Sequence, residues 1–166
     1  MSSVTATPDG PNELVLVEIP VVRPDDLDCR LELPCRPEAA AQARKLVAAA
    51  LAAWSAEKLT EVATLLVSEL VANAVRHAGC TRICVLVSRQ EVSIWVGVRD
   101  SSRELPCHMG QKSEAESGYG LGLVEALSSR WGVAWAPVGK WVWFELGARR
   151  PNRSAGVNSA APGQEA

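Results

Sequence analysis

The segment VATLLVSELVANAVRHAG, residues 62–79, places polar side chains where an amphipathic helix keeps its apolar face. At about 100° per residue, Glu69 and Asn73 fall one turn apart within an apolar stripe. That stripe is formed by Val62, Leu65, Leu66 and Leu70. A charged carboxylate in a dry core costs on the order of several kcal/mol unless it is paired. Either the stripe lines a wet pocket with Glu69 and Asn73 in its wall, or a local arginine such as Arg76 satisfies a buried Glu69. This helix alone leaves both interpretations open.

Asp100 ends a strand-like run, residues 91–100, in a similarly unexpected place. Strand parity puts it on the same face as four apolar residues, Val92, Ile94, Val96 and Val98. A carboxylate at the end of an inward-facing row is a good acceptor for a buried polar ligand. The alternative is an aspartate that caps the following turn, which is the commoner role and the favoured one for this residue alone.

Three glycines stand at every second position in ESGYGLGLVEAL, residues 116–127, directly before an apolar-periodic helix. Glycine lets backbone N–H groups approach a ligand closely, and a helix N-terminus favours anions. The pattern therefore suits a phosphate-binding loop. The chain has neither a Walker lysine motif nor the strand, glycine loop and distant acidic residue of a Rossmann site.

These residues need a scaffold, which the remaining pattern supplies. The expected elements are a strand at 29–33, helices at 37–54 and 55–78, a hairpin at 82–88 and 91–100, a helix that follows the glycine segment 118–122 and runs to about 130, and a second hairpin at 131–136 and 140–146. Between the first hairpin and the third helix lies a polar loop, 101–117, of a length that is often functional. We expect an α/β (α+β) fold, a two-layer sandwich with a mixed, mostly antiparallel sheet.

Length and composition fit one soluble domain: the chain has 166 residues, of which 48% are hydrophobic and 22% charged. A net charge of −2 argues against direct nucleic-acid binding. No apolar run reaches the roughly 18 residues of a membrane span, and we see no secretion signal, so we expect a cytoplasmic protein. The predicted organisation is a flexible leader at 1–27, an ordered domain at 28–148 and a disordered tail at 149–166. The five cysteines form no CxxC pair and are expected to be core residues or free thiols.

Together, the three polar features resemble the GHKL superfamily of ATPases, which has the Bergerat fold. Within it, the chain is similar to single-domain anti-sigma regulatory factors of the serine/threonine protein kinase-like, actinobacterial type. SELVANAVRHA resembles the N-box, VGVRDSS the adenine-binding segment and GYGLGL the last glycine box. GKWVWFEL resembles the closing strand, so the resemblance covers about residues 30–147.

The resemblance implies a role for each matched residue. Asn73 would be the ligand of the Mg²⁺ that bridges the ATP phosphates, and Glu69 the general base. Asp100 would accept a hydrogen bond from the adenine amino group. The other nucleotide-binding residues implied are Ser102, Arg103, Gly118, Tyr119, Gly120, Leu121 and Gly122. His77, one turn past Asn73, either borders the phosphate site or is a satisfied histidine at the helix end. Residues 101–117 would form the ATP lid, in which charge and position alone favour Arg103 or Lys112 as a phosphate contact.

Two departures from the family pattern stand out. The usual DxGxG box is here Asp100-Ser101-Ser102-Arg103-Glu104, with neither glycine, which bears on adenine binding. Tyr119 occupies a position where a basic or small residue is frequent, which bears on lid contacts.

The resemblance predicts an ATP·Mg²⁺-binding regulator. We expect an anti-sigma factor that sequesters a sigma factor and phosphorylates a serine of a STAS-type anti-anti-sigma partner. The alternatives are a non-catalytic, ATP-dependent protein-binding switch and a slow ATPase regulator unrelated to sigma factors. The presence of Glu69 favours catalysis over binding alone.

A cluster of tryptophans bears on self-association. Trp95, Trp141 and Trp143 have strand parity opposite to the core positions and should lie on the sheet face away from the helices. An apolar face of this kind predicts a homodimer or another partner surface, and the alternative is that residues 1–27 fold back over it.

Overall fold

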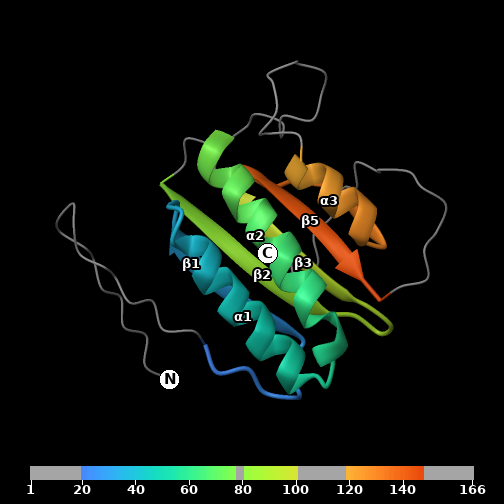
Figure 1. Cartoon of the computed structure of the whole chain (residues 1–166). Coiled ribbons are helices and arrows are strands. Elements are labelled where there is room, and N and C mark those ends of the chain that lie inside the picture. The colour runs from blue at the N-terminus through green and yellow to red at the C-terminus, as the bar shows by residue number, and fades with distance from the viewer. Residues whose placement is uncertain (1–19, 78–80, 101–118, 148–166) are drawn as a thin grey trace.

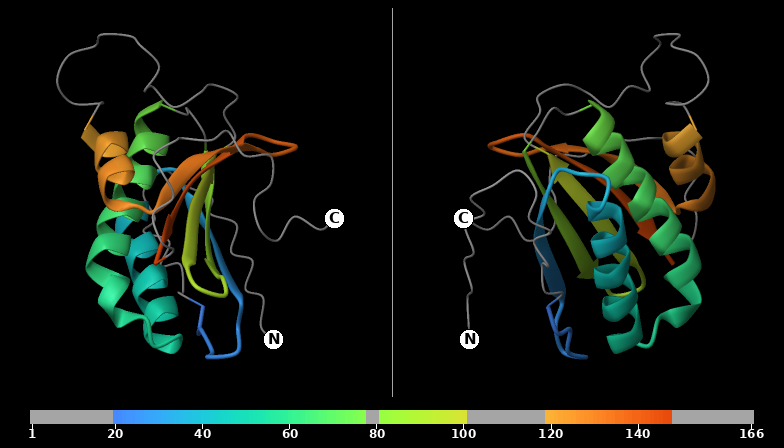
Figure 2. Two further views of the ribbon diagram at one scale, coloured as in Figure 1. Left: turned by 90° about the vertical axis from the view of Figure 1, so that its right-hand side faces the viewer. Right: turned by 60° about the vertical axis from the view of Figure 1, so that its left-hand side comes forward.

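The computed structural model describes residues 20–77, 81–100 and 119–147. They form three α-helices on one face of a five-stranded sheet (Figures 1 and 2). In chain order the elements are β1 (Asp28–Pro34), α1 (Ala39–Ala53), the 3₁₀ turn η1 (Glu57–Leu59), α2 (Thr60–His77), β2 (Arg82–Arg89), β3 (Ile94–Asp100), α3 (Tyr119–Leu127), β4 (Arg130–Trp135) and β5 (Lys140–Leu146). The expected element order and two-layer architecture are confirmed.

The strand order is β1-β2-β3-β5-β4, and each of the four pairings between described strands is antiparallel. The described part of the sheet therefore has no parallel pair, although a mixed sheet was expected. Because β5 lies between β3 and β4, the first and second hairpins join into one sheet. α2 packs against β3 and β5 and lies between α1 and α3.

Two expected boundaries were wrong. Val92 was assigned to the inward-facing row, but it is 76% exposed, because a turn closed by Gln90 N–H donating to Ser93 O delays the strand to Ile94. The third helix was expected to reach Arg130, but it ends at Leu127. The N–H and Oγ of Ser128 both donate to Val124 O there, and Arg130 already belongs to β4.

The helix-facing side of the sheet carries the main core. Alternate residues of β1, β2, β3 and β5 pack against the helices, with Val96, Val98 and Phe144 almost inaccessible. This alternation is the same alternation of side chains that predicted the strands from the sequence. Cys29 belongs to this core, and burial raises the pKa of its thiol to about 11.

The opposite face carries a second, smaller apolar cluster that contains the three tryptophans predicted to lie there. Trp95 stacks on Trp143 and meets Trp141 edge-on, each at 5.9 Å between ring centroids. Gly97 makes room for them, since a Cβ there would lie 2.3 Å from the Trp95 ring. The predicted face is therefore confirmed, but the three side chains are only 1–5% exposed. They do not form the open apolar patch from which a homodimer was predicted.

Cys84 lies in the same cluster and is a free thiol. Burial, with a smaller contribution from Glu32, raises its pKa to about 12. The expectation of core or free thiols is confirmed for Cys29 and Cys84, Cys35 packs against the main core, and the other two cysteines lie outside the described residues.

Part of the expected leader is tied to the sheet. Arg89 N–H donates to Leu27 O, and its guanidinium donates to Pro24 O. Residues 1–19 and the expected tail at 149–166 lie outside the described residues, so the domain boundaries stay predictions. Within the described ranges, no helix combines the length and the apolar character that a bilayer span requires.

The end of the sheet opposite Asp100 is fixed by a buried carboxylate. Glu145 accepts from Ser93 Oγ at 2.5 Å and from Arg130 Nε at 3.0 Å, and Arg130 Nη2 also donates to it. Since these residues belong to the start of β4, the end of β5 and the turn before β3, the network ties three strands together.

α1 ends in a Schellman motif whose left-handed position is not a glycine. Ala56 N–H donates to Leu51 O and Ser55 N–H to Ala52 O, with Ser55 at φ = 55°. A non-glycine residue at such a position carries a steric cost.

Ser55→Gly is expected to raise the free energy of unfolding by about 1 kcal/mol, because glycine adopts positive φ without that cost. Ala53→Gly, two residues earlier inside α1, should lower it by about 0.5–1 kcal/mol. Denaturant unfolding measures both. Destabilisation by both substitutions would contradict the assignment of Ser55.

Candidate functional site

At one end of the molecule the ends of four elements meet, three of which carry predicted site residues. These are the C-terminal end of α2, the end of β3, the start of β5 and the N-terminal end of α3, at the top of Figure 1. The other views agree (Figure 2). Segments far apart in sequence are thus brought together where the sequence analysis required them.

Glu69 and Asn73 lie at the edge of the buried stripe of α2, not in its middle. The buried residues of this helix are Ala63, Leu66, Val67, Leu70, Val71 and Ala74. Leu65, which was counted in the stripe, is 42% exposed, whereas Glu69 and Asn73 are half-buried. The expected stripe was therefore centred wrongly.

The edge on which they lie faces α3. Ser68 and Thr64 occupy the other flank, towards α1, where Arg44 donates to Ser68 Oγ at 3.0 Å. At about 100° per residue, Glu69 and Asn73 project from the opposite flank. Since α2 lies between α1 and α3, that flank is the one next to α3.

Neither polar side chain is satisfied by its surroundings within the described part of the chain. Glu69 and Asn73 have no side-chain hydrogen bond or ion pair there, and Arg76, which has interactions of its own, forms no ion pair with Glu69. The alternative of a locally satisfied glutamate is thus not supported. A half-buried carboxylate and amide without partners are suited to bind a ligand or to move a proton.

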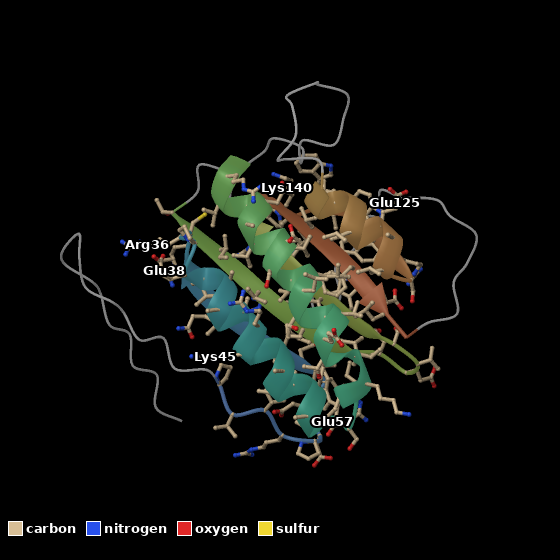
Figure 3. All side chains as sticks on the ribbon, in the orientation of Figure 1. Arg36, Glu38, Lys45, Glu57, Glu125 and Lys140 are labelled. Carbon is tan, nitrogen blue, oxygen red and sulfur yellow. The ribbon has the colours of Figure 1, made fainter. Side chains whose placement is uncertain are left out.

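Asp100 occupies its predicted place at the end of the inward-facing row and is 4% exposed. Its Oδ1 accepts from Lys140 Nζ at 3.2 Å, and this lysine is also 4% exposed. The two residues face each other across the β3–β5 ladder. Figure 3 shows Lys140 at the start of β5, beside the ends of α2 and α3.

Lys140 was missed by sequence reasoning, although a signal was present. In KWVWFEL the lysine has the parity of Val142 and Phe144, which are core positions, and not that of the tryptophans. A lysine at an inward-facing position is rarely buried without a partner, so this parity pointed to an anionic neighbour.

Gly120 and Gly122 of the glycine box lie inside the first turn of α3, whereas the box was expected to lead into the helix. Residues 119–122 are the four whose N–H groups have no acceptor within an α-helix. An ideal Cβ built on Gly122 meets no atom within 4 Å, so neighbouring described atoms do not explain the glycine. Leu121 is buried in the main core and anchors this turn.

The other predicted residues are only partly described. His77 is the last residue of α2, and Tyr119 and Gly120 are the first two residues of α3. Ser102, Arg103, Lys112 and Gly118 lie outside the described residues. A hollow of about 390 Å³ at the β4–β5 turn is lined by Trp135, Ala136, Pro137 and Gly139, and contains none of the predicted site residues.

The donor set on α2 fits Mg²⁺. This ion prefers oxygen ligands, and in nucleotide sites it uses one or two protein oxygens together with phosphates and water. The Asn73 amide oxygen and the Glu69 carboxylate are oxygen donors one turn apart, half-buried and without described partners.

Comparison with known proteins agrees with this geometry. No curated protein gives a significant match to the chain. Residues 33–146, more than half of the chain, match the histidine kinase-like ATPase domain. These residues run from the end of β1 to the end of β5 and include α2, Asp100 and α3. The chain therefore belongs to the histidine kinase-like ATPase domain family, whose GHKL members use ATP.

Proposed function

We propose that this protein binds ATP·Mg²⁺ and acts as an anti-sigma factor with serine/threonine protein kinase activity towards a STAS-type partner. The observation that carries the proposal is the pair Glu69 and Asn73. Both are half-buried, without described partners, and on the flank of α2 next to the glycine box of α3. Family membership supports the use of ATP.

In this proposal each element supplies one function. Asp100 accepts a hydrogen bond from the adenine amino group, and Asn73 supplies an amide oxygen to the metal. The N–H groups of the first turn of α3 bind phosphate oxygens. Bound Mg²⁺ would supply charge neutralisation for the phosphates.

Glu69 accepts the proton of the partner's serine hydroxyl as that oxygen attacks the γ-phosphorus. The new O–P bond forms while the bond from the γ-phosphorus to the β,γ-bridging oxygen breaks, and ADP leaves with that electron pair. The chain thereby contributes positioning and proton transfer, the main requirements of phosphoryl transfer.

A non-catalytic switch and a slow ATPase unrelated to sigma factors are the other candidates. Glu69, whose carboxylate has no partner among the described residues, favours proton-transfer chemistry over binding alone, because a pure binding site gains nothing from an unpaired base. The homodimer stays a prediction, and the buried tryptophans no longer argue for it.

Asn73→Ala is expected to weaken ATP binding at least about tenfold with Mg²⁺ present, and much less with EDTA, because it removes a metal ligand. Ser68→Ala, on the α1 flank of the same helix, is the matched control and should leave both affinities unchanged. Calorimetric titration measures them. An equal loss with and without Mg²⁺ would count against a metal role for Asn73.

Gly122→Ala should separate stability from binding. Alanine is the better helix former and meets no described atom, so the free energy of unfolding should rise by about 0.5–1 kcal/mol. If phosphates approach this turn, the added methyl group should weaken ATP binding about tenfold. Ala126→Gly, in the same helix, should instead lower stability and leave ATP binding unchanged. Unaltered ATP affinity in Gly122→Ala would exclude close phosphate approach at Gly122.

Glu69→Gln tests catalysis and removes the proposed base while keeping its shape. We expect ATP affinity to change less than about threefold and transfer of labelled phosphate to a partner serine to fall at least about 100-fold. Label on the partner with the wild-type protein is the expected result. Tight ATP binding without turnover would favour the switch, and release of free phosphate alone would favour the ATPase.

A further inference from the structure

Lys140 has no part in the roles assigned above, yet its ammonium nitrogen lies 3.2 Å from Asp100 Oδ1. The two residues are direct partners in the β3–β5 ladder, and both point to the helix-facing side, as Val98 and Val142 do. Each is 4% exposed. At such burial each charge stabilises the other, so the two form one electrostatic unit.

Stability alone is a weak explanation for this unit. A buried ion pair is often no more stabilising than a well-packed apolar pair of similar volume. A pair of apolar residues at these two positions would therefore stabilise this end of the β3–β5 ladder equally well. The location distinguishes this pair, because Asp100 is the residue whose carboxylate meets the base in the proposed function.

The ammonium changes what this carboxylate can recognise. An ionised carboxylate only accepts hydrogen bonds, whereas a protonated carboxyl group also donates. A buried carboxylate without a counter-ion tends to become neutral by binding a proton. Lys140 therefore keeps Asp100 a pure acceptor, and the contact at Oδ1 limits its rotation.

We propose that Lys140 is a positioning residue for base selection, which acts through Asp100 by holding its carboxylate ionised and in one orientation. The inference rests on the proposed nucleotide site. A carboxylate held in this way makes the site selective for a purine with an amino group at C6, as in adenine. A purine with a carbonyl oxygen at C6, as in hypoxanthine or guanine, presents an acceptor to an acceptor and is rejected.

The test compares the dissociation constants of ATP and ITP, which differ in the base at C6. For the wild type we expect a preference for ATP. Lys140→Met should reduce the ratio of ITP to ATP dissociation constants at least about tenfold, and Lys140→Arg, which keeps a cation, should hold it within about threefold. Arg130→Met removes the ion pair at the other end of β5 and should leave the ratio unchanged.

A double-mutant cycle tests whether Lys140 acts through Asp100. Asp100→Asn replaces the acceptor with a group that also donates, so the preference for ATP should already be small. Adding Lys140→Met in that background should change the ratio less than about twofold. A purely structural lysine would instead weaken ATP and ITP binding by equal factors in both backgrounds, and that result would overturn the inference.

Thermal unfolding of each variant is the control for correct folding, because Lys140→Met leaves a buried carboxylate without its ammonium. Should that variant not fold, two others carry the comparison. Lys140→Gln keeps an N–H donor without the charge, and the double variant removes both charges. The expected ATP preference decreases from wild type to Lys140→Gln to the double variant, and equal preference in all three would overturn the inference.

Failure of the proposed function gives a different result. In that case the wild-type protein binds neither nucleotide, and both proposals are overturned. If this inference alone is wrong, the wild type binds ATP and its preference for ATP over ITP does not depend on residue 140.

Discussion

The antiparallel register of β3 against β5 is the constraint on which the rest of the molecule depends. It sets Asp100 opposite Lys140 at one end and Ile94 opposite Leu146 at the other. Between these ends, alternate residues of both strands face either the helices or the tryptophan cluster. A slip by one residue would move Trp141 into the helix-facing core and Lys140 among the tryptophans, so apolar packing on both faces resists it.

Two ionic contacts then fix the ends of this ladder. At one end Arg130, Glu145 and Ser93 connect β4, β5 and the start of β3. At the other, the Asp100–Lys140 pair joins the last residue of β3 to the first residue of β5. The helices add their polar residues to this second end, because α2 finishes and α3 begins there. A rigid sheet thus positions groups that come from three separate segments.

Most elements of this arrangement were predictable from the sequence, because strand alternation, the proline before α1 and the glycines at the start of the last helix are local signals. The errors arose where partners are remote. Leu65 was placed in the core since a helical wheel cannot reveal that α2 has neighbours on two sides. Arg130, which was expected to end the third helix, instead begins β4, and its guanidinium pairs with the carboxylate of Glu145, fifteen residues further along the chain. Lys140 had the parity of a core residue, but only the register of β3 against β5 identifies its counter-ion.

The tryptophan cluster gives the sheet an optical property of its own. Indole rings that lie 5.9 Å apart, one pair stacked and one edge-on, couple their electronic transitions and produce circular dichroism that single indoles lack. Because Gly97 is what lets the Trp95 ring lie against the strand, this coupling depends on a residue that has no chromophore. The coupled signal of this cluster therefore reports the back of the sheet, whereas Trp54 and Trp131, which pack against the helix-facing core, contribute to the rest of the spectrum.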